Sequence, residues 1–187
     1  PQAAWCDSVD DILVVMKRGD ILTHSFHGMA CGILDDGGKV RESVHDAIER
    51  GVILDVGHGA GSFSWQIVES SIKEGVLPQT ISSDLHKYNV DGPVFDLAKV
   101  MTKFLYLGLS LDDVLAKVTS VPAQSVLMED QVGTLAPGAW GDAVVFELRT
   151  GEFRLEDSQG AVRTGRRAFE PVTVVAGGKV YRTALSR

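Results

Sequence analysis

Several side chains that can bind a metal or move a proton stand where apolar stretches of this 187-residue chain end. They are His24, His58, Asp84 and His86. Neutral imidazole and carboxylate are ligands that zinc, manganese and iron accept, and a bound divalent ion lowers the pKa of its water toward ~7. The residue types therefore predict metal-assisted hydrolysis, in which Asp84 takes the proton of the water and passes it to the leaving group.

The stretches around these residues alternate between helical and strand patterns. Amphipathic helices are predicted at 9–18, 40–50 and 63–74, and apolar strands at 20–28, 52–56 and 80–83. Such alternation is typical of a parallel sheet with crossover helices, in which catalytic groups gather at the carboxyl ends of the strands. Because the candidate residues are about one strand-helix repeat of ~30 residues apart, we expect them to converge at one edge.

The pattern changes in the last third of the chain. Helices are predicted at 95–107, from 110 onward, and at 122–127, and short strands separated by glycine turns at 143–148, 152–155, 172–176 and 179–181. We therefore expect an α/β domain over residues 1–130 and an all-β unit over residues 131–187.

Each candidate residue also has an ordinary structural explanation. A histidine at a strand end is often only hydrogen bonded, and Asp84 could simply cap the turn that follows it. His27 and His86 could be surface loop residues, and His45 lies within an amphipathic helix. The recurrence of such side chains over three successive strands favours the functional interpretation.

Composition narrows the classes of partner. A formal charge of −7 argues against nucleic acid and anionic membrane surfaces, and the basic cluster at 163–167 is interpreted as a solvated strand edge. No apolar run approaches the ~20 residues that span a bilayer. Cys6 and Cys31 lack metal spacing and are interpreted as reduced intracellular thiols, so we expect a soluble, cytoplasmic protein with a small-molecule substrate.

The stretch from Ile53 to Gly61 supports an alternative of another class. It resembles the first motif of Rossmann-like S-adenosylmethionine-dependent methyltransferases, whose glycines, here within 57–61, let the backbone approach the cofactor. Asp84 would then stand where that family places an acidic residue for the ribose. Against this, helices and an all-β unit follow where further α/β strands are needed, and His24 is left without a role.

Five ordered motifs, taken together, resemble the amidohydrolase superfamily and within it the dihydroorotase-like amidohydrolase/deacetylase branch. They are Gly19 to Gly28, Asp55 to Gly59 with Ser62-Phe63, Ile81 to His86, Val118 to Ala123, and Gly133 to Gly138 with Gly141 to Phe146. The resemblance implies the carboxyl-terminal portion of a (β/α)8 TIM-type barrel, about strands 6–8 with their helices, followed by part of a small β-sandwich. Gly141 departs mildly from the family, which usually has alanine there.

The resemblance also implies roles for single residues. In that superfamily one or two divalent ions bind a His-x-His pair on the first strand, a carboxylated lysine on the fourth, histidines on the fifth and sixth, and an aspartate on the eighth. Matched in order, His24 is the sixth-strand ligand, and Asp84 is the eighth-strand ligand and catalytic base. His58, Gly59 and His86 are implied to bind substrate, and zinc is the first choice of metal.

The family's amino-terminal ligands are missing from the sequence. No His-x-His pair precedes residue 24, and no lysine stands at a strand end before it. We therefore expect an amino-terminally truncated hydrolase of amide C–N or ester bonds that is nearly inactive alone. The open edge of its first strand would be covered by the missing amino-terminal part of the barrel or by another copy of the chain.

Overall fold

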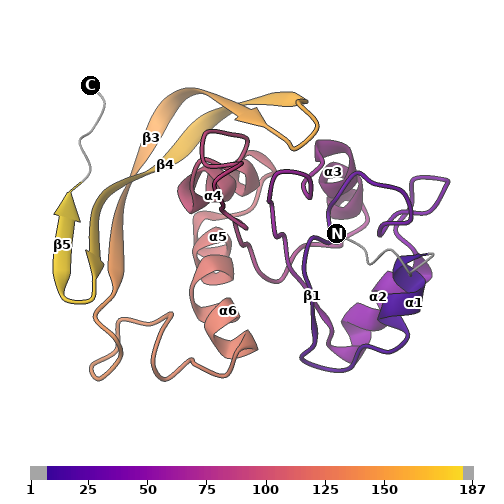
Figure 1. Cartoon of the computed structure of the whole chain (residues 1–187), viewed down its shortest axis with the longest axis horizontal. Coiled ribbons are helices and arrows are strands. Elements are labelled where there is room, and N and C mark those ends of the chain that lie inside the picture. The colour runs from indigo at the N-terminus through magenta and orange to yellow at the C-terminus, as the bar shows by residue number, and fades with distance from the viewer. Residues whose placement is uncertain (1–7, 183–187) are drawn as a thin grey trace. The chain divides into compact units, whose positions relative to one another are not determined.

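The computed structural model describes residues 8–182, which form two compact units (Figure 1). Unit 1 comprises residues 8–97 with 156–162, and unit 2 comprises residues 98–155 with 163–182. The units group the helices after residue 97 with the carboxyl-terminal strands, so they differ from the predicted division at residue 130. The domain assignment itself stays a prediction, and Cys6 lies outside the described residues.

The described part of unit 1 contains helices and a pair of short parallel strands. In chain order they are α1 (Val9–Leu13), β1 (Ile21–Leu22), α2 (Glu42–Arg50), β2 (Ile53–Leu54) and α3 (Trp65–Lys73). Ile21 pairs with Ile53 and Leu22 with Leu54 in parallel register. The parallel arrangement predicted from the alternation of helix and strand patterns is therefore present, although both strands are shorter than predicted.

Helix α1 is shorter than its apolar pattern indicates. The predicted amino-terminal cap is present, because the Ser8 hydroxyl accepts from the Asp10 amide and the Asp11 carboxylate accepts from the Ser8 amide. The prediction of a helix to residue 18 is wrong, since the helix ends at Leu13. Two β-branched residues follow it, Val14 and Val15, which are 77% and 70% exposed and have no packing to offset their low helix propensity.

The third predicted strand, at 80–83, is extended but not a regular strand. Thr80 forms an isolated parallel bridge with Asp55. Backbone hydrogen bonds then continue from Val56 to Thr80, from His58 to Ser82 and from Gly59 to Ser83. The Gly57 amide donates to the Ser82 hydroxyl over 3.0 Å, so a side chain adds to the backbone bonds that join these two segments.

Residues 157–161, which connect strand β3 (Ala143–Glu156) to strand β4 (Val162–Ala176), belong to unit 1 and stabilise the start of α3. Ser64 makes no side-chain cap bond there. The buried Asp157 carboxylate accepts from the Trp65 amide over 3.0 Å, and the Trp65 indole donates to the Ala161 carbonyl over 3.1 Å. A carboxylate at a helix amino terminus is favourable because it meets unpaired N–H groups and the positive end of the helix dipole.

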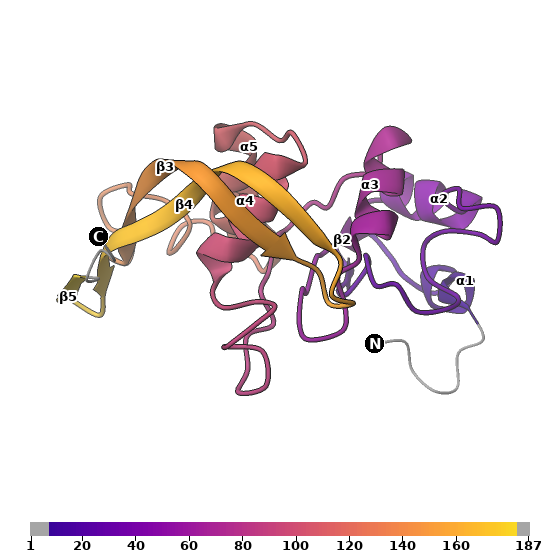
Figure 2. The same cartoon turned by 90° about the horizontal axis from the view of Figure 1, so that it is seen from above.

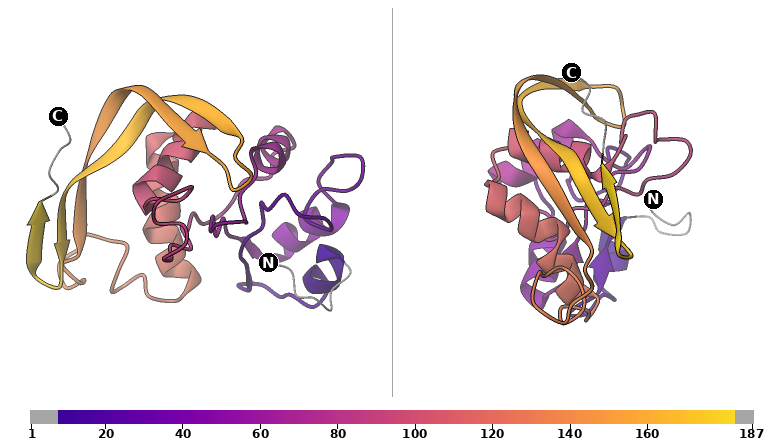
Figure 3. Two further views of the ribbon diagram at one scale, coloured as in Figure 1. Left: turned by 45° about the horizontal axis from the view of Figure 1, so that its top comes forward. Right: turned by 90° about the vertical axis from the view of Figure 1, so that its left-hand side faces the viewer.

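Unit 2 combines short helices with a three-stranded sheet of order β3-β4-β5. The elements are α4 (Leu97–Tyr106, whose first residue belongs to unit 1), α5 (Leu111–Val118), α6 (Ser120–Ser125), β3 (Ala143–Glu156), β4 (Val162–Ala176) and β5 (Lys179–Arg182). Figure 2 shows that the β3–β4 ribbon is long and twisted, and Figure 3 shows β5 beside β4. The Phe169 amide of β4 donates to the Thr102 hydroxyl of α4, so sheet and helix are joined within this unit.

Two strand predictions in this unit are corrected. The stretches at 143–148 and 152–155 are one continuous strand, and 172–176 is the end of the longer β4. Gly151 causes no turn between them, because it does not adopt the positive φ that a tight hairpin turn requires. Among residues 8–182, no helix has the length and apolarity needed to cross a membrane.

Candidate functional site

His24 and Asp84 meet at the ends of their segments in unit 1. The His24 Nε2 atom lies 3.3 Å from the Asp84 Oδ2 atom, and the two side chains are 17% and 48% exposed. Both residues have a positive φ, of 61° and 46°. Aspartate and histidine adopt positive φ more often than most residues other than glycine, and such values also recur at functional sites, so the backbone here is compatible with a site.

The glycine loop at 57–59 passes directly over this pair. Gly57 and Gly59 have φ values of 47° and 50°. A Cβ atom on Gly59 would lie 2.6 Å from Asp84 Oδ2, and one on Gly57 would lie 3.0 Å from the His24 backbone nitrogen. These glycines are therefore required by the close approach of His24 and Asp84, which explains the motif without a bound nucleotide cofactor.

His58 is enclosed within unit 1. Its side chain is fully buried, its Nδ1 atom lies 3.0 Å from the Gly59 carbonyl oxygen, and its ring stacks on Phe63 at 4.6 Å between centroids. Because a carbonyl only accepts, Nδ1 carries the proton in this contact. The imidazole thus binds the backbone of the glycine loop through the Gly59 carbonyl. The expected contact between His58 and the substrate stays a prediction.

His86 lies in the exposed turn that follows Asp84, and a buried asparagine fixes this turn. The Asn89 side-chain amide donates to the Asp84 carbonyl over 2.9 Å and accepts from the His86 amide over 2.8 Å. The His86 Nδ1 atom accepts from the Tyr88 amide over 3.2 Å. The sequence reasoning missed Asn89, although an asparagine shortly after a strand exit is a known signal for such a turn.

Asp55 is the second residue that the sequence reasoning missed. Its side chain is only 7% exposed, and it accepts three hydroxyl hydrogen bonds. The donors are Thr80 to Oδ1 over 2.6 Å, and Thr23 and Ser82 to Oδ2 over 2.7 and 2.6 Å. A single buried carboxylate thus joins the three segments that carry His24, the glycine loop and Asp84.

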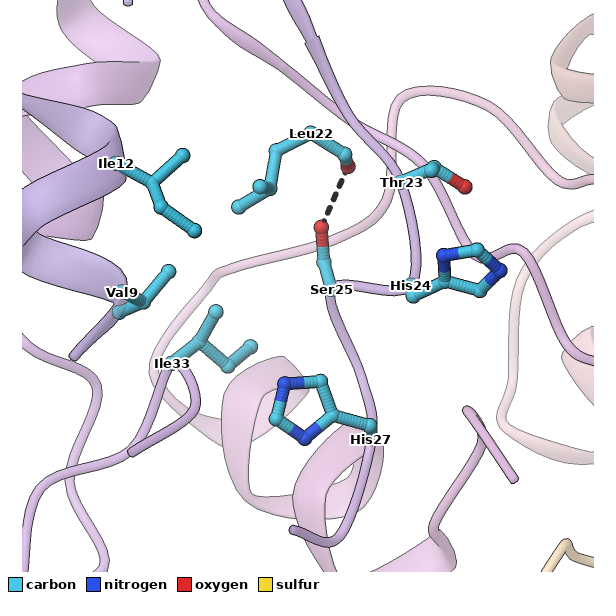
Figure 4. Close-up of a pocket in the computed structure, with 8 residues that line it drawn as sticks. All are labelled: Val9, Ile12, Leu22, Thr23, His24, Ser25, His27 and Ile33. Carbon is cyan, nitrogen blue, oxygen red and sulfur yellow. Dashed lines mark hydrogen bonds between the residues drawn. The ribbon is translucent and has the colours of Figure 1, made fainter. Parts of the chain in front are cut away.

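A small pocket of about 50 Å³ opens beside His24 (Figure 4). Its lining residues are Val9, Ile12, Leu22, Thr23, His24, Ser25, His27 and Ile33. The interpretation of His27 as a surface loop residue is wrong, because His27 is only 7% exposed and its Nδ1 atom accepts from the Met29 amide. Burial lowers the pKa of His27 below its ordinary value of 6.5, and the nearby His24 lowers it further.

The His27→Asn variant should reveal this lowered pKa in the pH dependence of stability. Well above pH 6.5 the imidazole is neutral in both the folded and unfolded chain. As the pH falls below 6.5, the unfolded chain takes up a proton that the folded chain resists, so the free energy of unfolding decreases by up to about 1.4 kcal/mol per pH unit. Between pH 7.5 and 5, the free energy of unfolding measured in urea should therefore decrease less for His27→Asn than for the wild type.

A parallel variant, His45→Asn, controls for the loss of a histidine elsewhere in unit 1, in helix α2. Asparagine at position 27 keeps an acceptor for the Met29 amide, so the comparison isolates the titration. Identical pH profiles for His27→Asn and the wild type would contradict the prediction.

The His24–Asp84 pair fits two positions of a metal coordination shell. Two ligands of a tetrahedral ion with bonds of about 2.1 Å are separated by roughly 3.4 Å, and the observed separation of the two atoms is 3.3 Å. Over residues 8–182, no group of three or more histidine, cysteine, aspartate or glutamate side chains is placed to hold an ion.

The sequence matches a family model and the sequences of known deacetylases. The model of the amidohydrolase family matches residues 61–181, which include Asp84 and His86 but not His24 or His58. A deacetylase from Enterococcus faecalis is 36% identical over 175 residues, which are 92% of this chain and 47% of that protein. A deacetylase from Agrobacterium fabrum is 37% identical over 175 residues, 91% of this chain and 42% of that protein.

Solved structures agree with these matches. An adenine deaminase superposes with a TM-score of 0.91 at 35% identity, over 95% of this chain and 49% of that chain. A dihydroorotase superposes with a TM-score of 0.81 at 34% identity, over 95% and 46%. The chain thus spans about half the length of the curated relatives it matches.

Proposed function

This chain belongs to the amidohydrolase family, and we propose that it is part of a metal-dependent hydrolase that cleaves an amide C–N or ester bond of a small molecule. The deacetylase relatives and the similarity to an adenine deaminase and a dihydroorotase support this class of reaction. The observation that carries the proposal is the pairing of His24 Nε2 with Asp84 Oδ2 at 3.3 Å, on residues that both have a positive φ.

His24 and Asp84 would hold a divalent ion, zinc in the first place, which when bound polarises a carbonyl and lowers the pKa of a water. The half-exposed Asp84 carboxylate would take a proton from the water that attacks the carbonyl carbon, and would pass it to the nitrogen or oxygen that leaves as the C–N or C–O bond breaks. Gly59 keeps its loop clear of that carboxylate, and we propose that His58, Gly59 and His86 contact the substrate.

We further propose that residues 1–130 are the carboxyl-terminal part of a (β/α)8 barrel, with β1, β2 and the segment at 80–83 as its strands 6–8, and that residues 131–187 are part of a β-sandwich. Within the described residues, β1 has β2 as its hydrogen-bonded neighbour on one side, and its other edge is open. An amino-terminal portion of the barrel or a second copy of the chain would cover this edge and supply the other metal ligands.

The methyltransferase alternative is not favoured. All the comparisons point to hydrolytic enzymes: the family match, the deacetylase relatives and the similar solved structures. The glycines at 57 and 59 are explained by the close approach of Thr23, His24 and Asp84, so no cofactor phosphate or ribose is needed to account for them.

The proposal predicts metal-dependent turnover by the intact enzyme, meaning this chain together with any residues that precede it in its gene. Hydrolysis should be measured on a panel of N-acetyl amino acids, O-acetyl hydroxy acids and cyclic amides. Treatment with a chelator should remove the activity, and zinc or manganese should restore it, because the ion is required to activate the water. The 187-residue chain alone should be at least about 100-fold less active, since removal of metal ligands abolishes the site. Turnover that resists chelation, or equal metal-dependent turnover by the isolated chain, would contradict the proposal.

A further inference from the structure

We propose that Asp55 is a positioning residue that sets the separation of His24 and Asp84 by binding the hydroxyls of the residues before them. The structural part of this inference stands on the hydrogen bonds of unit 1. Its catalytic part rests on the proposed function, because only a working site would show the consequence for turnover.

Asp55 holds His24 from both sides. The Thr23 hydroxyl donates to Asp55 Oδ2 over 2.7 Å, and the Ser25 amide donates to the Asp55 carbonyl over 3.2 Å. His24 lies between these two anchored residues with a φ of 61°. Since a left-handed backbone persists at a residue other than glycine only when its surroundings fix it, these two bonds account for the conformation that brings the imidazole toward Asp84.

The same carboxylate holds the segment before Asp84. The Ser82 hydroxyl donates to Asp55 Oδ2 over 2.6 Å, and its oxygen also accepts from the Gly57 amide. The Thr80 hydroxyl donates to Asp55 Oδ1 over 2.6 Å. Thr80 and Ser82 are two residues apart in an extended segment, so both side chains face Asp55 on one side. The Asp55 carboxylate therefore binds both the segment that leads into the Asp84 turn and the residue that precedes His24.

A carboxylate is the group that this arrangement requires. Three hydroxyls donate to Asp55, and an ionised carboxylate only accepts, with capacity for about four hydrogen bonds. Asparagine has nearly the same shape but replaces one oxygen by a donor, so at least one of the three hydroxyls can no longer donate to this side chain and must either accept from it or turn away. Asp55→Asn therefore perturbs the hydrogen bonds without creating a cavity.

The test compares Asp55→Asn with the wild type by amide hydrogen exchange, crystal structure and kinetics. Exchange of the Ser25 and Gly57 amides should accelerate by at least about tenfold relative to the Val68 amide of α3. Both amides keep their acceptors in this variant, but the carboxylate that fixes the Thr23 hydroxyl beside Ser25 and the Ser82 hydroxyl that binds Gly57 is lost. The His24 Nε2–Asp84 Oδ2 separation should lengthen. In the intact enzyme, kcat should fall by roughly 10–100-fold, the usual range for groups that orient a metal ligand, with little change in KM.

Asp10→Asn is the matched control in unit 1. The Asp10 carboxylate accepts from the Ser8 and Ser43 hydroxyls and pairs with Arg41, and none of these residues adjoins His24 or Asp84. This variant should lose stability while the relative exchange of Ser25 and Gly57, the pair separation and kcat stay as in the wild type. If Asp55→Asn behaves in the same way, Asp55 is only structural and the inference is wrong.

A second variant guards against misfolding of Asp55→Asn. Ser82→Ala removes one of the three hydroxyls that donate to Asp55, so the His24 Nε2–Asp84 Oδ2 separation in its crystal structure should lengthen as in Asp55→Asn. An unchanged separation in Ser82→Ala would overturn the inference. If the intact wild type shows no metal-dependent turnover, the proposed function fails, whereas exchange and pair separation still decide the role of Asp55.

Discussion

Replacement of Asp84 by asparagine should lower kcat/KM of the intact enzyme by about 10²–10⁴-fold, the contribution expected of a positioned acid–base group. Asparagine cannot take a proton from water, and its neutral oxygen is a weaker ligand for a divalent ion than a carboxylate. Folding should be nearly unaffected, within about 0.5 kcal/mol, because the Asp84 side chain is 48% exposed. Asparagine also tolerates the φ of 46° at this position.

Steady-state kinetics on the proposed acyl substrates, together with urea unfolding, would check this expectation. Asp91→Asn is a suitable control, since Asp91 is an exposed aspartate of the loop that follows Asp84. Its kcat/KM should equal that of the wild type. Full activity in Asp84→Asn would remove Asp84 from the mechanism, and a matching loss in Asp91→Asn would point to a general effect of charge on the loop.

The convergence of His24 and Asp84 could be predicted from the sequence for a simple reason. Parallel strands bring their carboxyl ends to one edge of a sheet, so residues at successive strand exits become neighbours whatever the intervening helices contain. The structure does bring these two side chains to 3.3 Å. The family membership was also predictable, because it depends on ordered motifs and not on the packing of any one of them.

The surroundings of the pair could not be predicted in the same way. Strand periodicity places Asp55 at a strand end but does not say that three hydroxyls from two other segments will meet it, because this depends on register between segments. His58 shows the same limit. Its position between glycines does not predict that the side chain is fully buried and stacks on Phe63, because sequence spacing alone does not fix the direction of the ring.

The predicted ends of helices and strands were wrong where local sequence signals competed with packing. Gly151 was interpreted as a turn, but the strand passes straight through it, since a glycine permits a turn without imposing one. In unit 1 the apolar pattern of α1 continued past its real end at Leu13. Glycines 57 and 59 differ from Gly151 because backbone or side-chain atoms occupy the space that a Cβ would need.

That distinction leads to the second large effect, at Gly57. Gly57→Ala should lower the free energy of unfolding by about 2–4 kcal/mol, the sum of the cost of a left-handed alanine and of overpacking. Its Cβ would clash most closely with the Thr23 hydroxyl oxygen, and would lie 2.8 Å from His24 Cδ2 and 3.0 Å from the His24 backbone nitrogen. A backbone atom cannot rotate aside, so the strand exit itself would have to move.

Gly59→Ala and Gly61→Ala complete a matched series within one loop. At Gly59 the nearest atom to a new Cβ is the half-exposed Asp84 carboxylate, which can rotate away, so stability should fall less than at Gly57 while the His24–Asp84 contact is lost. Gly61 has open space around it and no positive φ, so its replacement should change stability by no more than about 0.5 kcal/mol. Urea unfolding of the three variants would measure this order. Equal losses at 57 and 61 would mean that the glycines serve the flexibility of the loop, and that close approach to His24 and Asp84 is not the reason for the motif.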